Sequence, residues 1–344
     1  MRSTRPARLE SKAVEAGGTS PRPVKRTVVV AALSGIAVAC GSAPDGPAIR
    51  VIVPRGASFA TATDSLKAKG MVGAPTLFRV YARLKGDDRN IKPGTYLLKR
   101  GTSWGDILSA LNGGRGLVNT VTIPEGFSLS RIVPLLAQRL GVPVDSVNAA
   151  VRDSTLIARL GIPTPTVEGY VFPDTYAFPE GTTARQAVDE MVKRFEREWK
   201  QEWTAILPGL ARNRHDIVTL ASIIEKEARK PEERSVIAAV YLNRIRKGML
   251  LQADPTVQYA LGKHTPRVLY KDLEIDSPYN TYRNPGLPPG PIASPGAASL
   301  AAALFPAKVP YLYFVAYPDG HHEFRRTITE HEAAVRDARS RSSP

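Results

Sequence analysis

Two glutamates at the end of one apolar helical segment are the side chains in this sequence best suited to acid–base chemistry. Residues 216–228 repeat apolar side chains at helical spacing, and Glu225 and Glu227 flank the apolar stripe. A carboxyl at such a boundary is half-buried, and desolvation there raises its pKa toward the range of a general acid. The alternative is a solvated helix flank whose carboxylates pair with nearby lysines and arginines. The spacing does not choose between the two glutamates.

Further polar groups follow this helix at two places. The first group, Gln252 and Asp254, lies close to an expected helix end. The second group, at 280–282, follows the pair Ser277-Pro278. These residues are Gln252, Asp254, Asn280, Thr281 and Tyr282. For the first group, ordinary capping and turn chemistry is an equally good interpretation.

Two loops have the composition of walls around a groove. Residues 168–176 combine aromatic and acidic side chains with a glycine and a proline. Aromatic faces stack on sugar rings and acids bind hydroxyls, so Glu168 and Tyr170 are candidates for ligand contact; a loop that caps the core is the alternative for Tyr170 and Phe172. Residues 285–296 contain eight prolines or glycines. Such a segment cannot be a helix or a central strand, and it predicts an extended wall.

The elements that must position these groups begin with a short motif that occurs three times. In each copy a β-type run precedes a glycine, a serine follows two residues later, and a leucine lies ten residues after the glycine. The glycines are Gly56, Gly101 and Gly126, and the leucines are Leu66, Leu111 and Leu136. Each copy predicts a strand, a turn and a capped helix.

The three copies predict small α/β modules within an α+β protein. The first two, with the turn at 92–96 between them, resemble a LysM-like glycan-binding domain over residues 48–116. Beyond residue 116 the pattern predicts a larger α/β region with a helix at 184–199.

Composition narrows the classes of function. The 344 residues are 43% apolar and 23% charged, enough for a sizeable core and two modest domains. A net charge of +15 indicates an anionic neighbour. The sequence contains no zinc-ligand spacing, no aromatic-basic strand motif and no glycine-rich phosphate loop, so we do not expect it to bind nucleic acid. Anionic lipid and the cell wall remain as candidates for the anionic neighbour. One cysteine and five scattered histidines predict neither an internal disulfide nor a metal site, and no cofactor.

The N-terminal sequence predicts a membrane anchor. A basic leader at 1–26 precedes an uncharged run at 27–43, and this asymmetry keeps the leader in the cytoplasm. As a helix the run reaches roughly 25 Å, just short of a hydrocarbon core of about 30 Å. A thin spanning helix is our first interpretation, and a lipoprotein signal ending at Cys40 is the second. Both place residues 44–344 outside the cytoplasm; a buried core helix of a cytosolic protein is the third.

Six blocks occur in an order that is typical of one family. They are Glu168–Tyr176, Leu220–Ala228, Leu251–Val257, Tyr279–Tyr282, Gly286–Pro295 and Pro310–Ala316. From about residue 48 to residue 335 the chain resembles the YceG-like endolytic murein transglycosylases, also called MltG. The departure is Cys40, because the family usually has a plain spanning helix.

The resemblance implies a function and assigns the residues. The family cleaves nascent peptidoglycan at the membrane between N-acetylmuramic acid and N-acetylglucosamine, and its catalytic glutamate maps onto Glu225. We expect saccharide contacts from Gln252, Asp254, Asn280, Thr281 and Tyr282, and an opposite wall of Glu168 and Tyr170. A hydrolytic muramidase with Glu227, Asp254 or Glu168 as second carboxylate is the alternative, and a non-catalytic glycan-binding scaffold is another.

The resemblance also implies the organisation and the partners. A LysM-like domain at 48–116 is followed by a catalytic domain at 119–335 and a basic tail at 336–344. The expected partners are glycan strands, the cytoplasmic membrane and membrane-bound peptidoglycan synthases.

Overall fold

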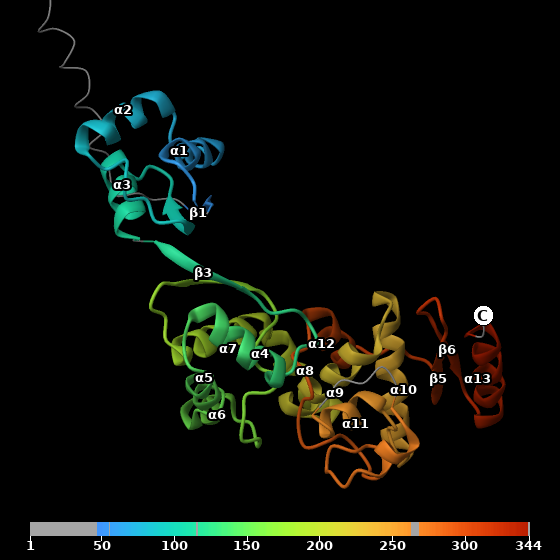
Figure 1. Cartoon of the computed structure of the whole chain (residues 1–344). Coiled ribbons are helices and arrows are strands. Elements are labelled where there is room, and N and C mark those ends of the chain that lie inside the picture. The colour runs from blue at the N-terminus through green and yellow to red at the C-terminus, as the bar shows by residue number, and fades with distance from the viewer. Residues whose placement is uncertain (1–46, 55, 115, 263–267, 343–344) are drawn as a thin grey trace, which may run out of the picture.

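A computed structural model describes residues 47–342 except residues 55, 115 and 263–267 (Figure 1). The leader and the apolar run at 27–43, with Cys40, lie outside the described residues, so the predicted anchor stays a prediction. Among the residues described, none of the helices has the length and apolar character needed to cross a membrane.

The described elements alternate between strands and helices at first and are mainly helical afterwards. The first are β1 Ala48–Val53, α1 Phe59–Ala68, α2 Pro75–Lys85, β2 Gly94–Lys99, α3 Trp104–Gly113, β3 Leu117–Thr122, α4 Leu129–Leu140, α5 Val144–Ala150, α6 Ser154–Leu160 and β4 Thr175–Pro179. The remainder are α7 Ala184–Glu198, α8 Gln201–Leu210, α9 Arg214–Glu227, η1 Pro231–Glu233, α10 Arg234–Arg246, α11 Asp254–Ala260, η2 Tyr270–Glu274, α12 Ala297–Leu304, β5 Tyr313–Ala316, β6 His322–Arg325 and α13 Ile328–Ser342. The predicted helix at 184–199 is confirmed as α7.

The threefold strand–turn–helix motif is confirmed in all three copies. The units are β1 with α1, β2 with α3, and β3 with α4. Each turn glycine has a positive φ, between 72° and 87°, which a side chain would disfavour. The leucine ten residues later is fully buried in every copy. In the first two copies the serine hydroxyl caps the helix. In the third copy Ser128 makes no such bond, and the Glu168 carboxylate accepts from the first helical amide instead.

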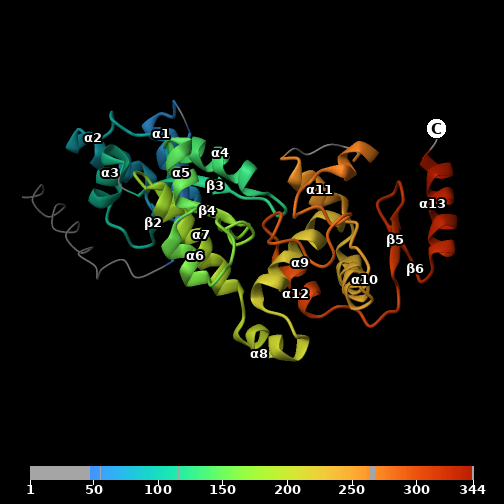
Figure 2. The same cartoon turned by 90° about the horizontal axis from the view of Figure 1, so that it is seen from below.

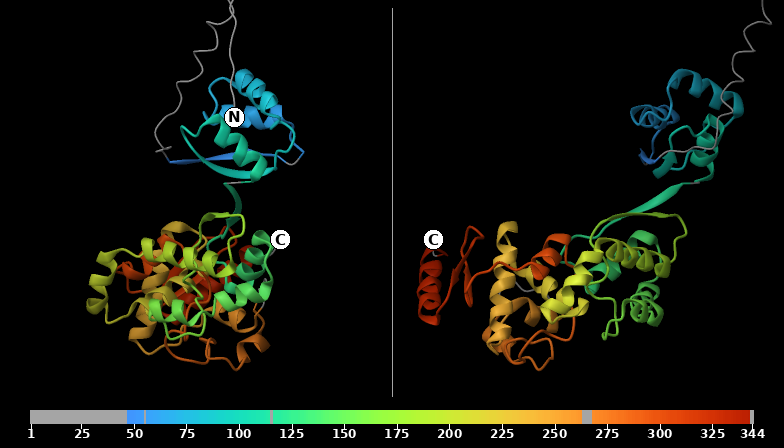
Figure 3. Two further views of the ribbon diagram at one scale, coloured as in Figure 1. Left: turned by 90° about the vertical axis from the view of Figure 1, so that its left-hand side faces the viewer. Right: turned by 180° about the vertical axis from the view of Figure 1, so that it is seen from behind.

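Strand β3 connects two hydrophobic cores. The four-stranded sheet has the order β1-β2-β3-β4, and its pairs are antiparallel. β3 pairs with β2 only at Leu117 and Val118, and with β4 from Val118 to Thr122. Buried residues between Val51 and Leu111 form the first core, and residues between Val121 and Leu304 form the second. Figures 1 and 3 show β3 running from one group of elements to the other.

The fold class is α+β, as expected, but the larger region differs from the predicted α/β arrangement. Its strand pairs, where the structure describes them, are antiparallel, and most of its residues lie in helices. The long apolar run of this region forms one central helix, α9, as its helical spacing predicts. Figure 2 shows α9 among α10, α11 and α12, each of which packs against it.

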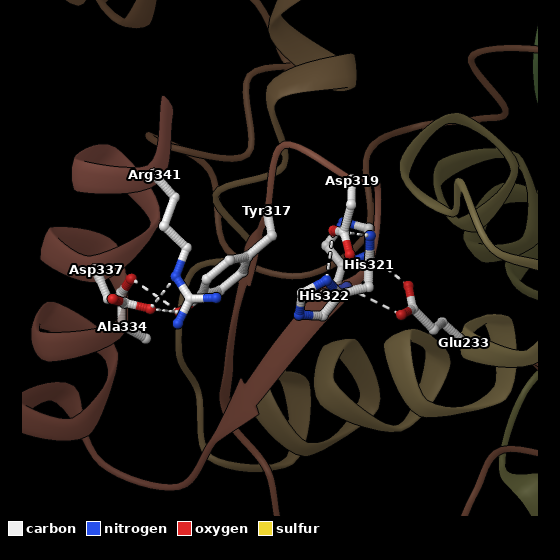
Figure 4. Close-up of polar contacts among 8 residues, drawn as sticks. All are labelled: Glu233, Tyr317, Asp319, His321, His322, Ala334, Asp337 and Arg341. Atoms are coloured by element: carbon white, nitrogen blue, oxygen red, sulfur yellow. Dashed lines mark hydrogen bonds and ion pairs between the residues drawn. The ribbon is translucent and has the colours of Figure 1, made fainter. Parts of the chain in front are cut away.

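The C-terminal hairpin β5-β6 is fixed to both of its neighbours by buried or half-buried polar contacts (Figure 4). The Tyr317 hydroxyl donates to Asp337 of α13 at 2.9 Å, and Asp337 also pairs with Arg341 at 3.0 Å. On the other side, Nδ1 of His322 lies 2.6 Å from Glu233 at the start of α10. Residues 336–342, within the predicted basic tail, continue α13, where Ala338 is buried.

Candidate active site

Helix α9 is fixed at its start and carries both candidate glutamates at its end. Asn213 and Asp216 form a capping box, with bonds of 2.9 and 3.0 Å between each side chain and the other residue's amide. All eight residues from 217 to 224 are buried. The predicted single apolar stripe is therefore too narrow, because three helices and a loop surround α9.

The Pro- and Gly-rich segment 285–296 lies along α9, in agreement with the predicted wall. This segment, described throughout, forms neither helix nor strand. Nε2 of His215 donates to the Pro289 carbonyl at 2.8 Å, and the Ile292 amide donates to the Ser222 hydroxyl at 3.0 Å. At the far end the Gly296 amide reaches Glu225. The wall thus follows the helix to its catalytic candidate.

Glu225 is held by donors on one of its two oxygens. Oε2 accepts from the Ser299 hydroxyl at 2.7 Å and from the Gly296 amide at 3.0 Å, where α12 begins. Arg234 lies 3.8 Å from Oε1 and donates from Nε to the Ser299 hydroxyl at 3.2 Å. The Glu225 side chain is only 7% exposed. A backbone amide, a hydroxyl and a guanidinium thus surround this carboxyl.

Glu125 is a second carboxylate beside Glu225, and sequence reasoning missed it. A Cβ added to Gly296 would lie 1.8 Å from Oε1 of Glu125, so this carboxyl rests directly on the glycine whose amide binds Glu225. Burial, and then the charge of Glu225, raises the pKa of Glu125, while Arg234 lowers it. One signal existed: the residue before the turn glycine is an arginine in the other two motif copies and a glutamate here.

Glu227 belongs to a different cluster on the other side of α9. Its Oε1 accepts from the Tyr241 hydroxyl at 2.8 Å, and burial raises its pKa to about 7. The charge of Asp254 contributes to that rise in the pKa of Glu227. Asp254 itself accepts a hydrogen bond of 2.5 Å from the Tyr282 hydroxyl. The structure therefore brings Asp254 and Tyr282 together with Glu227 rather than with Glu225.

Glu168 caps helix α4 instead of lining an open wall. Both of its oxygens accept from the Leu129 amide, at 3.1 and 3.0 Å, in the position where Ser128 was expected to cap. The Tyr259 hydroxyl donates to it at 3.3 Å. Glu168 is 4% exposed, and burial raises its pKa to about 7. It still borders a pocket beside α9.

The remaining predicted contacts divide into one exposed residue and two supporting ones. Gln252 is exposed and adopts a φ of 51°, rare for a residue with a side chain. Asn280 is fully buried and donates to two backbone carbonyls at 2.8 and 2.9 Å. Thr281 is 1% exposed and accepts from the Ala253 amide. Burial leaves Asn280 and Thr281 no surface for a saccharide. Thr281 instead holds the Gln252 turn, and Asn280 holds the backbone at residues 273–275.

Tyr170 is part of the core. It is fully buried, its hydroxyl lies 3.0 Å from Nδ1 of His215, and its ring packs edge-on against Phe195. Contact with a saccharide, as predicted for Tyr170, is incompatible with this burial. In the part of the chain that the structure describes, no group of three or more acidic, histidine or cysteine side chains is arranged to hold a metal ion.

The protein thus has an α+β fold in which a buried glutamate, held by hydrogen-bond donors, lies at the end of a central helix. The chain belongs to the YceG-like family, whose model matches residues 51–337. A solved YceG-like protein from Listeria monocytogenes superimposes with a TM-score of 0.61 at 35% identity, over 83% of this chain and 98% of that one.

Two relatives bear the name endolytic murein transglycosylase. That of Bacillus subtilis (strain 168) is 36% identical over 301 residues, 83% of this chain and 83% of the relative. That of Streptococcus pneumoniae serotype 2 is 31% identical over 323 residues, which cover 82% of this chain and 58% of the longer relative. The family match, over residues 51–337, includes the helix that carries Glu225 and the segments that hold it.

Proposed function

We propose that this protein is an endolytic lytic transglycosylase, a carbon–oxygen lyase that cuts nascent peptidoglycan and so limits the length of glycan strands. The bond cut is the one between N-acetylmuramic acid and N-acetylglucosamine, and the product ends in 1,6-anhydro-N-acetylmuramic acid. The observation that carries the proposal is the Glu225 carboxyl, buried and held on one oxygen. Membership of the family and the names of the relatives support it.

One oxygen of Glu225 is placed to serve both halves of this reaction, while the other is held by donors. Oε2 accepts from Ser299 and Gly296, which leaves Oε1 to carry the proton of the neutral acid. Oε1 gives that proton to the leaving glycosidic oxygen. The sugar's C6 hydroxyl then attacks C1 and returns its proton to Oε1, so no water and no second carboxylate are consumed. Arg234, 3.8 Å from Oε1, stabilises the carboxylate between the two transfers.

A hydrolytic muramidase is the second candidate, and Glu125 is the observation that favours it. Hydrolysis requires a second carboxylate that activates water or attacks the sugar. Glu125 lies beside Glu225, whereas Glu227 and Asp254 lie in a separate cluster and Glu168 is occupied by the Leu129 amide. Glu125 therefore replaces the three candidates for the second carboxylate that the sequence suggested.

The test is mass spectrometry of products from purified glycan strands. Glu225→Gln should fold and release no anhydro ends, because the amide is nearly isosteric but donates no acidic proton. General acid–base groups contribute about 10²–10⁴-fold in rate, and one group here serves both steps, so we expect the upper end. Glu227→Gln is the matched control on the same helix and should retain most activity. An active Glu225→Gln enzyme rejects the assignment, and reducing ends formed with uptake of water indicate the muramidase.

A complete absence of cleavage by the unmodified protein would favour the third candidate, a glycan-binding scaffold for membrane-bound synthases. We further propose that residues 48–116 act as a LysM-like glycan-binding module, since they surround a core of their own. A fragment of residues 48–122, which keeps β3 whole, should bind glycan strands weakly and cleave none. Failure of that fragment to sediment with peptidoglycan, while a 119–335 fragment binds fully, would make the module a spacer.

We also propose that residues 27–43 anchor the protein to the cytoplasmic membrane, with the catalytic part outside. The basic leader and the uncharged run support this, and the choice between a spanning helix and a lipid on Cys40 rests on sequence alone. Mass spectrometry of the mature N-terminus tests it. Retention of the leader supports the spanning helix, and a diacylated Cys40 at the first position supports the lipoprotein.

A further inference from the structure

A pocket of about 870 Å³ opens beside α9, next to the catalytic glutamate but on another face of the helix. Its volume lies within the range of sites that hold small ligands. Gly126 links the two places, because a Cβ added to it would lie 3.6 Å from Lys226 and 3.7 Å from Glu225. Whatever occupies the pocket therefore contacts the residue adjacent to Glu225.

Among the described residues, three cations line this pocket, each from a different part of the chain. Lys226 comes from α9, Arg131 from α4, and Arg152 from the turn after α5. Within the described part of the chain, none of the three takes part in a salt bridge of 4.0 Å or less, whereas many other arginines of this protein do. Lys226 donates to the Gly126 carbonyl at 3.3 Å, and Arg131 lies 3.7 Å above the Phe127 ring.

The cations affect one another. Burial, and then the charge of Arg131, lowers the pKa of Lys226, while Glu225 raises it. Among the described residues of the lining, the one acid is Glu168, which accepts from the Leu129 amide. Unbalanced positive charges that surround a cavity favour an anionic occupant, and arginines bind carboxylates through paired hydrogen bonds.

The rest of the lining is apolar and indicates more than a small inorganic anion. Val133, Pro134, Val151 and Ile292 contribute to the walls. An occupant with carboxylates at its end and aliphatic groups along its length would match both parts of this surface. A phosphate would match only the cations.

We propose that this pocket binds the carboxylate-bearing peptide attached to the muramic acid of the substrate, with Arg131, Arg152 and Lys226 as its anion contacts. The inference rests on the proposed function and deepens it by naming the part of the substrate that is recognised. Peptide bound here fixes the position of its own sugar relative to Glu225, because Lys226 and Glu225 are consecutive residues of one rigid helix. The protein should consequently prefer strands that carry peptides to strands from which an amidase has removed them.

Calorimetry with the full-length protein tests the site without relying on cleavage. The probe is a soluble disaccharide of N-acetylglucosamine and N-acetylmuramic acid that carries a tetrapeptide, which lacks the bond to be cut. Arg131→Gln and Arg152→Gln, on separate elements, should each weaken its binding about ten- to hundredfold, the worth of a charge-assisted hydrogen bond. Arg139→Gln is the control, since Arg139 is exposed on the same helix as Arg131 but outside the pocket. It should bind like the unmodified protein.

Two further probes distinguish the source of the anion. The same disaccharide without its peptide should bind at least tenfold more weakly than the peptide form and be indifferent to both substitutions. Equal binding of the two disaccharides overturns the proposal. So does a result in which both variants bind the peptide form as tightly as the unmodified protein does. Tighter binding of inorganic pyrophosphate, lost in both variants, would assign the pocket to phosphate instead. If the protein binds the peptide form as expected but cuts no strand, the proposed enzymatic function is rejected and the proposed peptide site is retained.

Discussion

The Ser299 hydroxyl, at the start of α12, donates a 2.7 Å hydrogen bond to Oε2 of Glu225, at the end of α9. Ser299 is fully buried and also accepts from Arg234, so its orientation is fixed. In the proposed reaction the hydroxyl occupies Oε2 and leaves Oε1 of Glu225 available for proton transfer.

Ser299→Ala should lower kcat by about tenfold or more and change KM little, because a bond to a charged group in a buried site is removed without touching the sugar contacts. Rate measurements on glycan strands check this. Ser146→Ala, on the exposed face of α5, is the control. An unchanged kcat in Ser299→Ala would show that Oε2 needs no hydroxyl donor.

Gly296→Ala should lower the activity for steric reasons alone. The backbone at Gly296 has a φ of −77°, which alanine adopts freely, yet its Cβ would overlap the Glu125 carboxyl. That carboxyl is the end of a flexible side chain and can turn away, so we expect a smaller loss of activity than in Glu225→Gln, with cooperative unfolding retained. Gly209→Ala, where a Cβ meets nothing within 4 Å, is the matched control. Activity equal in the two variants would contradict the packing described here.

Glu125→Gln distinguishes the two enzyme classes. In a lytic transglycosylase Glu125 takes no proton, so the variant should keep forming anhydro ends at a rate within about tenfold of the unmodified protein. In a muramidase it should stop the uptake of water. Digestion in H₂¹⁸O followed by mass spectrometry reads both results from one sample. Loss of anhydro products in Glu125→Gln, with folding intact, would show that the lytic reaction itself requires this carboxylate.

The pH dependence of stability should report the burial of Glu227. Burial raises its pKa from 4.5 to about 7, so the folded protein binds a proton that the unfolded chain releases, and stability falls as the pH rises through that window. Glu227→Gln is neutral throughout and still accepts from Tyr241. Relative to the unmodified protein it should gain up to about 3 kcal/mol between pH 4.5 and pH 8. Urea unfolding at the two pH values checks this, and a difference that does not change with pH contradicts it.

Local sequence was sufficient for the features that depend on near neighbours. The three strand–turn–helix units, the helix at 184–199 and the helix that carries Glu225 follow from turn glycines, capping serines and apolar spacing, all of which act within about ten residues. The family followed from the order of several such blocks, which is also a property of the sequence. The stiff wall at 285–296 followed from its prolines and glycines.

Only the tertiary structure decided which polar side chains meet. Glu125, Gly296 and Ser299 surround Glu225 although they come from distant parts of the sequence, and no local spacing specifies that contact. The same physics removed Tyr170 and Asn280 from the surface, because packing around a central helix, rather than composition, sets burial. Sequence thus determined which groups could do chemistry and, through the family resemblance, pointed to Glu225. The packing of α9 against α12 and the wall determined which donors contact that carboxyl.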